Sequence, residues 1–330
     1  SMRRVLFSKF LAVGFAGAVC AMAAHAQSQP PSSYPTKAVH LLVSNTAGST
    51  PDVLARYLGT RLTDAWKQPV LVENRGGAGG IVATDTVARA APDGYTLLVG
   101  ADGPITILPA LQKSLPYDVQ RDLIPVASLG ETDFLLVANP KTGFKTLQDF
   151  VKAARAEPGR YNYASAGNGT ALQFSMEQLK HDAGIHVTHI PYRGGPLGMA
   201  DVIAGQVDVM FIAVTPALAH VRDGRLVALA SGGAARHALL PTVPTVAETY
   251  KGFRAGTWFG LFAPANTPQA VVDALGTAAD QILANPATRS ELAAQGVQTT
   301  GYGQTRFRSQ VQAESRRYAL LAQQVGIKGD

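Results

Sequence analysis

Short β-branched apolar runs alternate along the chain with longer segments whose apolar residues recur every three or four positions. Residues 39–43, Val-His-Leu-Leu-Val, have the composition of a buried strand, and residues 53–62 have the spacing of one helical face. This alternation predicts an α/β fold with a largely parallel sheet. Strands are predicted at 39–43, 70–72, 96–99, 134–137, 161–164, 186–190, 207–211, 226–230 and 258–262. Helices are predicted at 53–62, 81–90, 146–156, 171–180, 197–204, 268–284 and 304–325.

The predicted elements form two similar series, separated near Pro125 and followed by a helical C-terminal segment. Two such series predict two Rossmann-like lobes joined by two crossing strands. We place the crossings near residues 126–137 and 253–263. The predicted boundaries are residues 27–126 and 253–330 for lobe 1, and residues 127–252 for lobe 2, which is inserted into lobe 1.

The N-terminus has the features of a secretory signal. Basic residues among the first nine precede an apolar run at 10–22, and Ala24 and Ala26 supply the small residues of a cleavage site. The run is shorter than the ~20 apolar residues that span a bilayer. We therefore expect a signal peptide at residues 1–26, with Ser1 a cloning remnant, and export to the periplasm after cleavage behind Ala26. A buried N-terminal helix is the alternative.

Composition narrows the function classes further. Cys20 is the only cysteine and lies inside the predicted signal, so the mature chain has no disulfide, thiolate nucleophile or zinc–thiolate site. Gly17 and Val19 make lipid attachment at Cys20 a poor alternative. The formal net charge of +6 falls to +3 without the three basic residues of the signal. Because the basic residues are scattered and the chain is exported, we expect a small anionic solute and no nucleic acid.

One strand–loop–helix junction offers an anion site at residues 44–52. The loop is rich in Gly and hydroxyl residues, Thr50 is placed to cap the next helix, and Pro51 suits its first turn. Free backbone N–H groups beside the positive end of a helix bind anions. Ordinary helix capping is the alternative. The candidate ligand-binding residues here are Asn45, Thr46, Ala47, Gly48, Ser49 and Asp52.

Two further junctions follow the same logic. The loop 165–170 has two glycines that allow close backbone approach, and Thr170 with Gln173 forms a predicted capping box. The junction 192–196 adds the guanidinium of Arg193. A plain tight turn and a solvated arginine are the respective alternatives. Facing loops from the two lobes would hold both ends of a short diacid through charge-assisted hydrogen bonds. The candidate ligand-binding residues here are Ser165, Gly167, Asn168, Gly169, Thr170, Tyr192 and Arg193.

Other motifs do not support catalysis or metal binding. The Gly-rich run 75–80 lacks the Lys-Ser/Thr ending of a P-loop and the spacing of a dinucleotide site, so we expect a turn bordering the cleft. A Gly-x-Ser-x-Gly elbow is absent from the sequence. His186 and His189 are close in sequence, but three positions apart on the predicted strand 186–190 they would face opposite sides. We expect no catalytic residue, no metal site and no cofactor.

Ordered motifs over nearly the whole mature chain resemble a known family. They include Gln-Pro-Val-Leu-Val-Glu-Asn-Arg at 68–75, Ala-Pro-Asp-Gly-Tyr-Thr-Leu-Leu at 91–98, and the segments 165–170, 189–194 and 205–211. The chain resembles the Bug-type (Bordetella uptake gene) extracytoplasmic solute receptors of the tripartite tricarboxylate transporter family. The resemblance implies a type II periplasmic-binding-protein fold with Venus-flytrap closure. It also implies a monomer that holds a small organic carboxylate and delivers it to two membrane components of a transporter.

The sequence departs from the family pattern at the implied ligand site. The first loop usually reads Pro-Phe-x-x-Gly-Gly, where this chain has the uncharged polar run 44–49. Ile212 stands where an aspartate is frequent, and Asp102 replaces what is often a small uncharged residue. Without an acid at 212, a di- or aromatic carboxylate is expected before an amino acid, although Asp102 could supply an acid elsewhere. Asp102 and Thr215 complete the candidate site.

Two functions remain open from the sequence. The first hypothesis is a transport receptor for a carboxylate, and the alternative is a ligand-sensing receptor for a membrane signalling partner. An enzyme on the same scaffold, of the porphobilinogen-condensing type, needs a cysteine to anchor its cofactor, and the mature chain has none.

Overall fold

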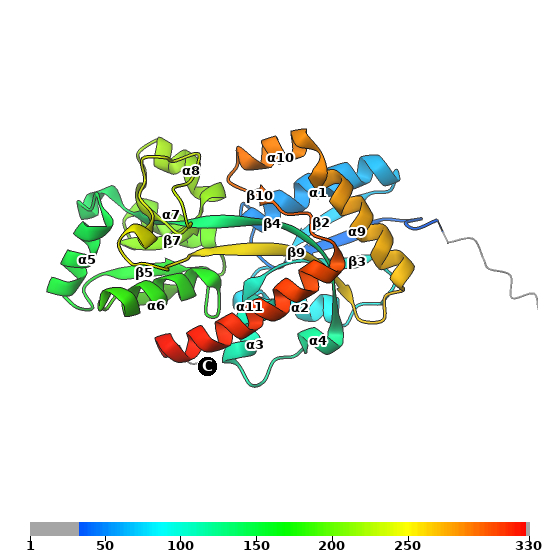
Figure 1. The fold of residues 1–330 in the computed structure, drawn as a ribbon, viewed down its shortest axis with the longest axis horizontal. Helices are drawn as coiled ribbons and strands as arrows, with labels where there is room; N and C mark the ends of the chain where they lie inside the picture. Colours follow the sequence, from blue (N-terminus) through cyan, green and yellow to red (C-terminus); the bar gives the residue numbers. More distant parts are fainter. Residues whose placement is uncertain (1–32, 328–330) are drawn as a thin grey trace, which may run out of the picture. The chain divides into compact units, whose positions relative to one another are not determined.

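The computed structural model describes residues 33–327. The predicted signal peptide, its cleavage behind Ala26 and Cys20 therefore lie outside the described residues. The chain separates into residues 1–34 and residues 35–330, and the fold below is that of the second unit (Figure 1). In the described part of the chain, no helix combines the length and apolar character needed to cross a membrane.

Three parallel strands begin the first sheet. β1 pairs in parallel with β2 and β3, and β9 pairs antiparallel with β3, in the order β2-β1-β3-β9-β4. The strands of this first sheet are β1 (Val39–Val43), β2 (Val70–Asn74), β3 (Thr96–Ala101), β9 (Gly256–Pro264) and the short β10 (Gln298–Thr299). The associated helices are α1 (Thr50–Trp66), α2 (Ile81–Ala88), α3 (Leu108–Leu111), α4 (Val119–Asp122), α9 (Gln269–Ala284), α10 (Pro286–Ala293) and α11 (Gln304–Val325).

The second sheet has the same kind of parallel unit. β5 pairs in parallel with β6 and β7, and β4 pairs antiparallel with β7 and β8. Its strands are β4 (Leu123–Ala138), β5 (Asn162–Ser165), β6 (Thr188–Pro191), β7 (Val209–Ala213) and β8 (Val227–Ser231). Its helices are α5 (Leu147–Ala156), α6 (Ala171–Ala183), α7 (Gly195–Ala204) and α8 (Val214–Arg222).

One strand belongs to both sheets. β4 pairs with β9 over residues 123–133 and with β7 and β8 over residues 134–138 (Figure 1). β4 and β9 are thus the two crossing strands that the sequence predicted near 126–137 and 253–263. The division of the chain into lobe 1 (27–126 and 253–330) and lobe 2 (127–252) stays a prediction.

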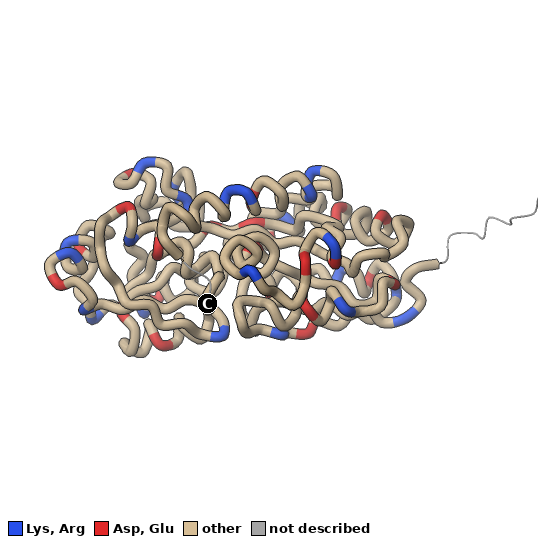
Figure 2. Tube along the Cα trace, turned by 90° about the horizontal axis from the view of Figure 1, so that it is seen from below, with Lys and Arg blue, Asp and Glu red and all other residues tan. Residues whose placement is uncertain are grey.

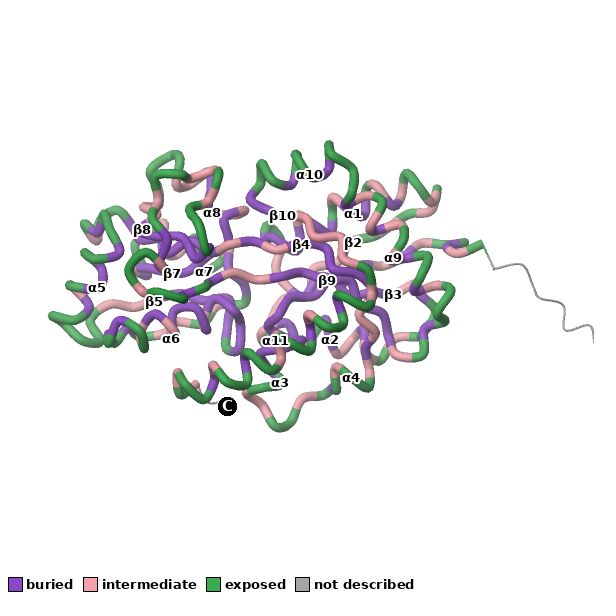
Figure 3. Tube along the Cα trace, viewed as in Figure 1, coloured by how far each residue is buried: buried purple, intermediate pink, exposed green. Residues whose placement is uncertain are grey.

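The helix α11 also spans the two sheets. Phe307 and Val311 pack in the core around β3 and β9, whereas Tyr318 and Ala322 pack in the core of the second sheet. Figure 3 shows the buried residues following the strands of both sheets, with exposed residues on the outer faces of the helices. Figure 2 shows Lys and Arg interspersed with Asp and Glu along the chain.

Most predicted elements are present, and the differences have local causes. The capping box of Thr146 and Asp149 at the start of α5 is confirmed. The strand predicted at 186–190 begins only at Thr188, because its partner β5 begins at Asn162, which pairs with Thr188. The argument that placed His186 on this strand was therefore wrong. The sequence did not predict α8, whose Pro216 reads as a helix breaker but is tolerated in a first turn.

The packing of α11 on β9 requires a glycine. A Cβ on Gly260 would lie 2.0 Å from Cζ of Phe307, a side chain that is fully buried. Gly276 in the middle of α9 differs, since the nearest atom to a Cβ there is the Val126 carbonyl oxygen at 3.6 Å. Alanine is therefore expected to clash at position 260 and to fit at position 276, so Gly276 serves as the control for Gly260.

We expect Gly260→Ala to lower the free energy of unfolding by about 1–3 kcal/mol, because the ring of Phe307 must move in a close-packed core. Gly276→Ala should raise the free energy of unfolding by about 0.5–1 kcal/mol, because alanine is the better helix former. Urea unfolding of the three proteins checks both changes. Equal stability of the Gly260→Ala variant and the parent chain would contradict the packing described.

Candidate ligand-binding site

A cavity of about 70 Å³ lies where loops of the first and second sheets meet. Asn45 and Ser49 line it from the loop after β1, Ala166 and Thr170 from the loop after β5, and Pro196 from the segment after β6. The structure thus brings the three predicted loops to one cavity. Parallel strands place such loops together because their carboxyl ends meet at one edge of a sheet.

Four helices begin at this cavity. Its lining includes Thr50 of α1, Ala171 of α6, Gly195 of α7 and Pro216 of α8, and these helices have 17, 13, 10 and 9 residues. The first N–H groups of a helix have no partner within it, and each N-terminus carries roughly +0.5 elementary charge. The arrangement favours an anion in the cavity.

Three threonine hydroxyls near these helix ends are without hydrogen-bond partners among residues 33–327: Thr46, Thr50 and Thr215. Thr50 is 2% exposed and lines the cavity. The prediction that Thr50 caps α1 is wrong, since Ser49 occupies the cap position and Thr50 is the first helical residue. A buried hydroxyl without a partner is costly, so that of Thr50 is a natural contact for a ligand.

Asp52 and Gly48 stabilise the first loop. The carboxylate of Asp52, 5% exposed, accepts from the Gly48 amide at 2.9 Å, Nε of Arg56 at 2.9 Å and Nδ2 of Asn74 at 2.9 Å. The Gly48 amide is thus already bonded within the loop. Gly48, Ala47 and Asp52 do not line the cavity.

The second loop is bonded to itself. The Gly167 amide donates to Oγ of Ser165 at 3.0 Å, and the Gly169 amide donates to Oε1 of Gln173 at 2.8 Å. The hydroxyl of Thr170 donates to the Gly167 carbonyl at 2.7 Å. These two glycine amides are therefore not free for a ligand. The predicted capping box is wrong, because Gln173 reaches Gly169 instead of Thr170.

The third junction lines the cavity with Gly195 and Pro196, and the charge of Arg193 does not reach it. Arg193 is exposed and does not line the cavity, and the hydroxyl of Tyr192 donates to Asp201. Gly195 and Pro196 line the cavity in their place. No Lys or Arg side chain is among the described residues that line it.

Glycines allow the loops of the two sheets to touch. A Cβ on Gly79 would lie 2.7 Å from the Asn168 carbonyl oxygen, and a Cβ on Gly194 would lie 2.1 Å from Oγ1 of Thr46. Gly79, from the run 75–80, lines the cavity, as expected of a turn bordering the cleft. These close approaches exclude any larger side chain at the two positions.

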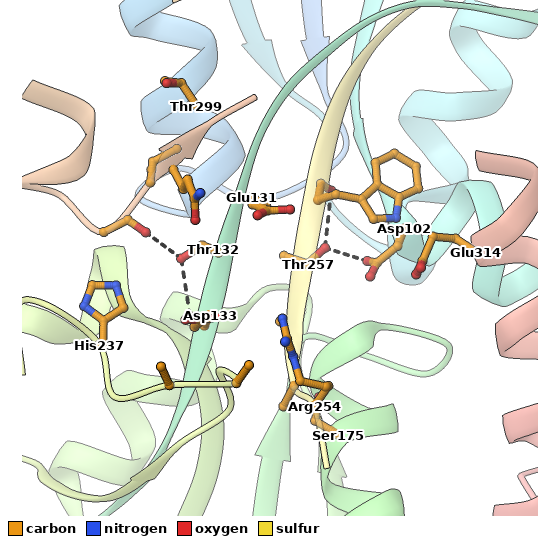
Figure 4. A pocket seen from close by; sticks show the side chains of 18 of the residues that line it. Asp102, Glu131, Thr132, Asp133, Ser175, His237, Arg254, Thr257, Thr299 and Glu314 are labelled. Carbon is orange, nitrogen blue, oxygen red and sulfur yellow. Dashed lines mark hydrogen bonds between the residues drawn. The ribbon is translucent and has the colours of Figure 1, made fainter. Parts of the chain in front are cut away.

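Asp102 is the one ionisable side chain among the described residues that line the cavity. It is 2% exposed, and its carboxyl accepts from the Thr257 hydroxyl at 2.7 Å (Figure 4) and the Tyr318 hydroxyl at 3.0 Å. Burial raises the pKa of Asp102 to about 7, against the lowering effect of these two hydrogen bonds. Both the neutral and the ionised form of the Asp102 carboxyl are therefore populated near pH 7.

A larger hollow of about 900 Å³ lies against the crossing strands (Figure 4). Its lining mixes acidic and basic side chains, including Glu131, Asp133 and Arg254, and Asp102 lies at the boundary with the smaller cavity. Burial raises the pKa of Glu131 and Asp133. α6 and α11 present their middle turns to this hollow, and α10 presents its C-terminal end, so no helix N-terminus faces it among the described lining residues. It therefore lacks the feature that favours an anion in the smaller cavity.

Sequence reasoning missed several residues at the smaller cavity. Pro216, at the start of an unpredicted helix, had a weak signal in the Thr-Pro pair. Thr257 had none, since 155 positions separate it from Asp102. Among the described residues, no group of three or more His, Cys, Asp and Glu is placed to hold a metal ion.

Comparison with known proteins identifies the family. The sequence model of the tripartite tricarboxylate transporter family receptor (TctC) matches residues 54–327. The chain is 33% identical to protein BugT of Bordetella pertussis over 298 residues, which is 90% of this chain and 91% of BugT. A solved R. palustris protein with adipate superposes with a TM-score of 0.87 at 28% identity, over 89% of this chain and 99% of that chain.

A second solved structure is MatC from Rhodopseudomonas palustris with bound malate. It superposes with a TM-score of 0.82 at 31% identity, over 87% of this chain and 99% of that chain. The fold is therefore that of the periplasmic binding proteins, as the sequence motifs implied. The chain belongs to the tripartite tricarboxylate transporter receptor family, whose members are periplasmic solute-binding proteins and not enzymes.

Proposed function

We propose that this protein is an exported receptor that captures a small organic carboxylate in the 70 Å³ cavity and delivers it to the two membrane components of a tripartite tricarboxylate transporter. One observation carries the proposal: four helix N-termini converge on a cavity whose described lining has no basic side chain. Helix N-termini and hydroxyls bind a carboxylate without an ion pair. The related structures with adipate and malate support the ligand class.

A dicarboxylate or aromatic carboxylate fits this cavity better than an amino acid. Ile212, 2% exposed, lines it at the position where the family pattern often has an aspartate. An ammonium group beside Ile212 would face an apolar side chain at the position where the family pattern often supplies an aspartate. Phe134 and Leu172 extend the apolar wall.

The direct test is a thermal-shift screen of mono-, di- and tricarboxylates. At about 100 times its Kd, one bound carboxylate should stabilise the protein by about 2.7 kcal/mol and raise Tm by roughly 5–10 °C. Amines and neutral sugars of similar size serve as controls and should leave Tm unchanged. No shift with any carboxylate would count against the proposed ligand class.

Thr50→Val tests the anion site. The valine keeps the side-chain shape but removes the unpartnered hydroxyl. We expect the Kd of the carboxylate found in the screen to rise roughly 10- to 100-fold, because this is the contribution of one hydrogen bond to a charged group. The stability of the ligand-free protein should stay equal or increase. Calorimetric titration and urea unfolding measure the two quantities.

Thr267→Val is the matched control. Thr267 is 6% exposed, its hydroxyl donates to the Pro264 carbonyl at 2.7 Å, and it does not line the cavity. This variant should lose about 1 kcal/mol of stability and keep its ligand affinity. Equal affinities of the Thr50→Val variant and the parent chain would contradict the assignment of Thr50.

Asp102→Asn tests the charge of the cavity. In the parent protein, unfolded Asp102 is ionised above its ordinary pKa near 4, whereas folded Asp102 keeps its proton up to about pH 7. The folded state therefore binds more protons, and the free energy of unfolding falls as the pH rises through this window. Relative to Asp102→Asn, the parent should lose about 2–3 kcal/mol between pH 5 and pH 8.

The same ionisation should weaken carboxylate binding. Above pH 7 the ionised Asp102 repels a ligand carboxylate in a cavity of low dielectric, so the Kd of the parent should rise with pH while that of Asp102→Asn stays level. Asp64→Asn, on an exposed turn of α1, is the control. A parallel pH dependence of stability in the Asp102→Asn variant and the parent would show that Asp102 does not titrate in this range.

A further inference from the structure

His189 lies behind the second ligand loop and outside the lining of the cavity. Its Nε2 lies 2.6 Å from Oγ of Ser165, the residue that also accepts the Gly167 amide. Its Nδ1 lies 3.5 Å from Nε2 of Gln173, whose Oε1 accepts the Gly169 amide. The imidazole thus contacts both side chains that hold the amides of the loop 165–170.

The hydrogen-bond pattern assigns the tautomer of His189. Because Oε1 of Gln173 accepts from Gly169, the NH₂ group of Gln173 faces the imidazole, and Nδ1 must be the acceptor. Nε2 then carries the proton and donates to Oγ of Ser165. The Ser165 hydroxyl donates in turn to the Gly167 carbonyl, at 3.3 Å.

A second proton on His189 would break this arrangement. Nδ1–H would face the NH₂ group of Gln173, so that two donors meet. Gln173 cannot turn over to offer its oxygen without presenting NH₂ to the Gly169 amide, which is also a donor. The imidazolium must therefore lose its contact with Gln173, or Gln173 must release Gly169.

We propose that His189 is a positioning residue for the ligand site, and that its neutral Nε2–H tautomer keeps the loop 165–170 in its binding conformation through Ser165 and Gln173. Protonation of the ring releases the loop and weakens ligand binding. This inference rests on the proposed function, because the loop matters for binding only if the cavity takes the ligand.

The surroundings of the ring favour the neutral form. The ring is half-buried and stacks on Tyr163 of β5, with the centroids 4.8 Å apart. Burial lowers the pKa of His189 below its ordinary value of 6.5, Glu177 opposes this lowering, and Lys180 adds to it. Glu177 and Lys180, both on α6, pair with each other at 2.8 Å, and the Tyr163 hydroxyl also donates to Glu177. The ring is therefore neutral at pH 7.

The test needs no ligand. Long-range ¹H–¹⁵N correlation spectra of the full mature protein at pH 8 should show the Nε2–H tautomer at His189. Amide hydrogen exchange, normalised to the intrinsic rate at each pH, should show that Gly169 loses about tenfold in protection when the pH falls below the pKa of His189. An Nδ1–H tautomer, or protection of Gly169 that does not change through the titration, would overturn the proposal.

Two variants separate this role from a merely structural one. His189→Gln keeps an N–H donor for Ser165 but cannot titrate, so the protection of Gly169 should no longer depend on pH. His186→Gln alters an exposed histidine three residues away and should keep the pH dependence of the parent. Retention of the pH dependence in His189→Gln would also overturn the proposal.

Titrations with adipate and malate complete the experiment. If His189 acts as proposed, the ratio of the parent's Kd to that of His189→Gln should rise about tenfold for either carboxylate as the pH falls below the pKa of His189, a change equal to about 1.4 kcal/mol. The titrations of Asp102 and of the ligand affect both proteins alike and cancel in this ratio. Failure of both compounds and of the wider carboxylate panel to bind would count against the proposed function. The exchange result in the ligand-free protein would stand independently of that failure.

Discussion

The ligand cavity depends on β4, a 16-residue strand that is hydrogen-bonded into both sheets. With β9 it holds the two parallel units so that the carboxyl ends of β1 and β3 face those of β5 and β6. The segments that line the cavity follow β1, β2, β3, β5, β6 and β7, and residues of β3, β4, β7 and β9 complete the lining. A receptor that closes on its ligand needs this geometry, because crossing strands join its halves at a hinge while the loops remain opposite each other.

The cavity favours an anion without an opposing cation. A buried carboxylate normally requires a partner to replace its hydration, and Lys or Arg is the usual choice. In the proposed site, four helix N-termini and the Thr50 hydroxyl would take that role, as fixed dipoles that lose little side-chain entropy when a ligand binds. Asp102 works in the opposite direction. In the proposed site its charge would repel an anion at high pH.

The binding loops are held by their own side chains. Asp52 accepts the Gly48 amide, Ser165 accepts that of Gly167, and Gln173 accepts that of Gly169. A loop that is bonded in this way loses less conformational entropy on binding, which improves affinity without additional ligand contacts. The conformation of the loop 165–170 also depends on the side chains that contact Ser165 and Gln173. His189 is the titratable one among them.

The sequence by itself determined most of the strands and longer helices, the two series, the capping box at Thr146 and the three loops that meet at the cavity. These follow from local patterns, because hydrophobic period, cap residues and glycine spacing act within a few positions. Motifs along the chain also implied the receptor family. Local patterns erred at Thr50, His186 and Gln173, where an offset of one or two residues changes which groups pair.

Only the tertiary structure decided which polar groups are already bonded. The partners of Asp102 lie 155 and 216 positions away, and His189 of β6 contacts Ser165 of the neighbouring strand β5. No periodic pattern in the sequence indicates such contacts, because they form where elements that are distant in the sequence pack together. The loop 165–170 shows the consequence, because its glycines indicated close backbone approach to a ligand, yet the fold supplied internal acceptors for their amides.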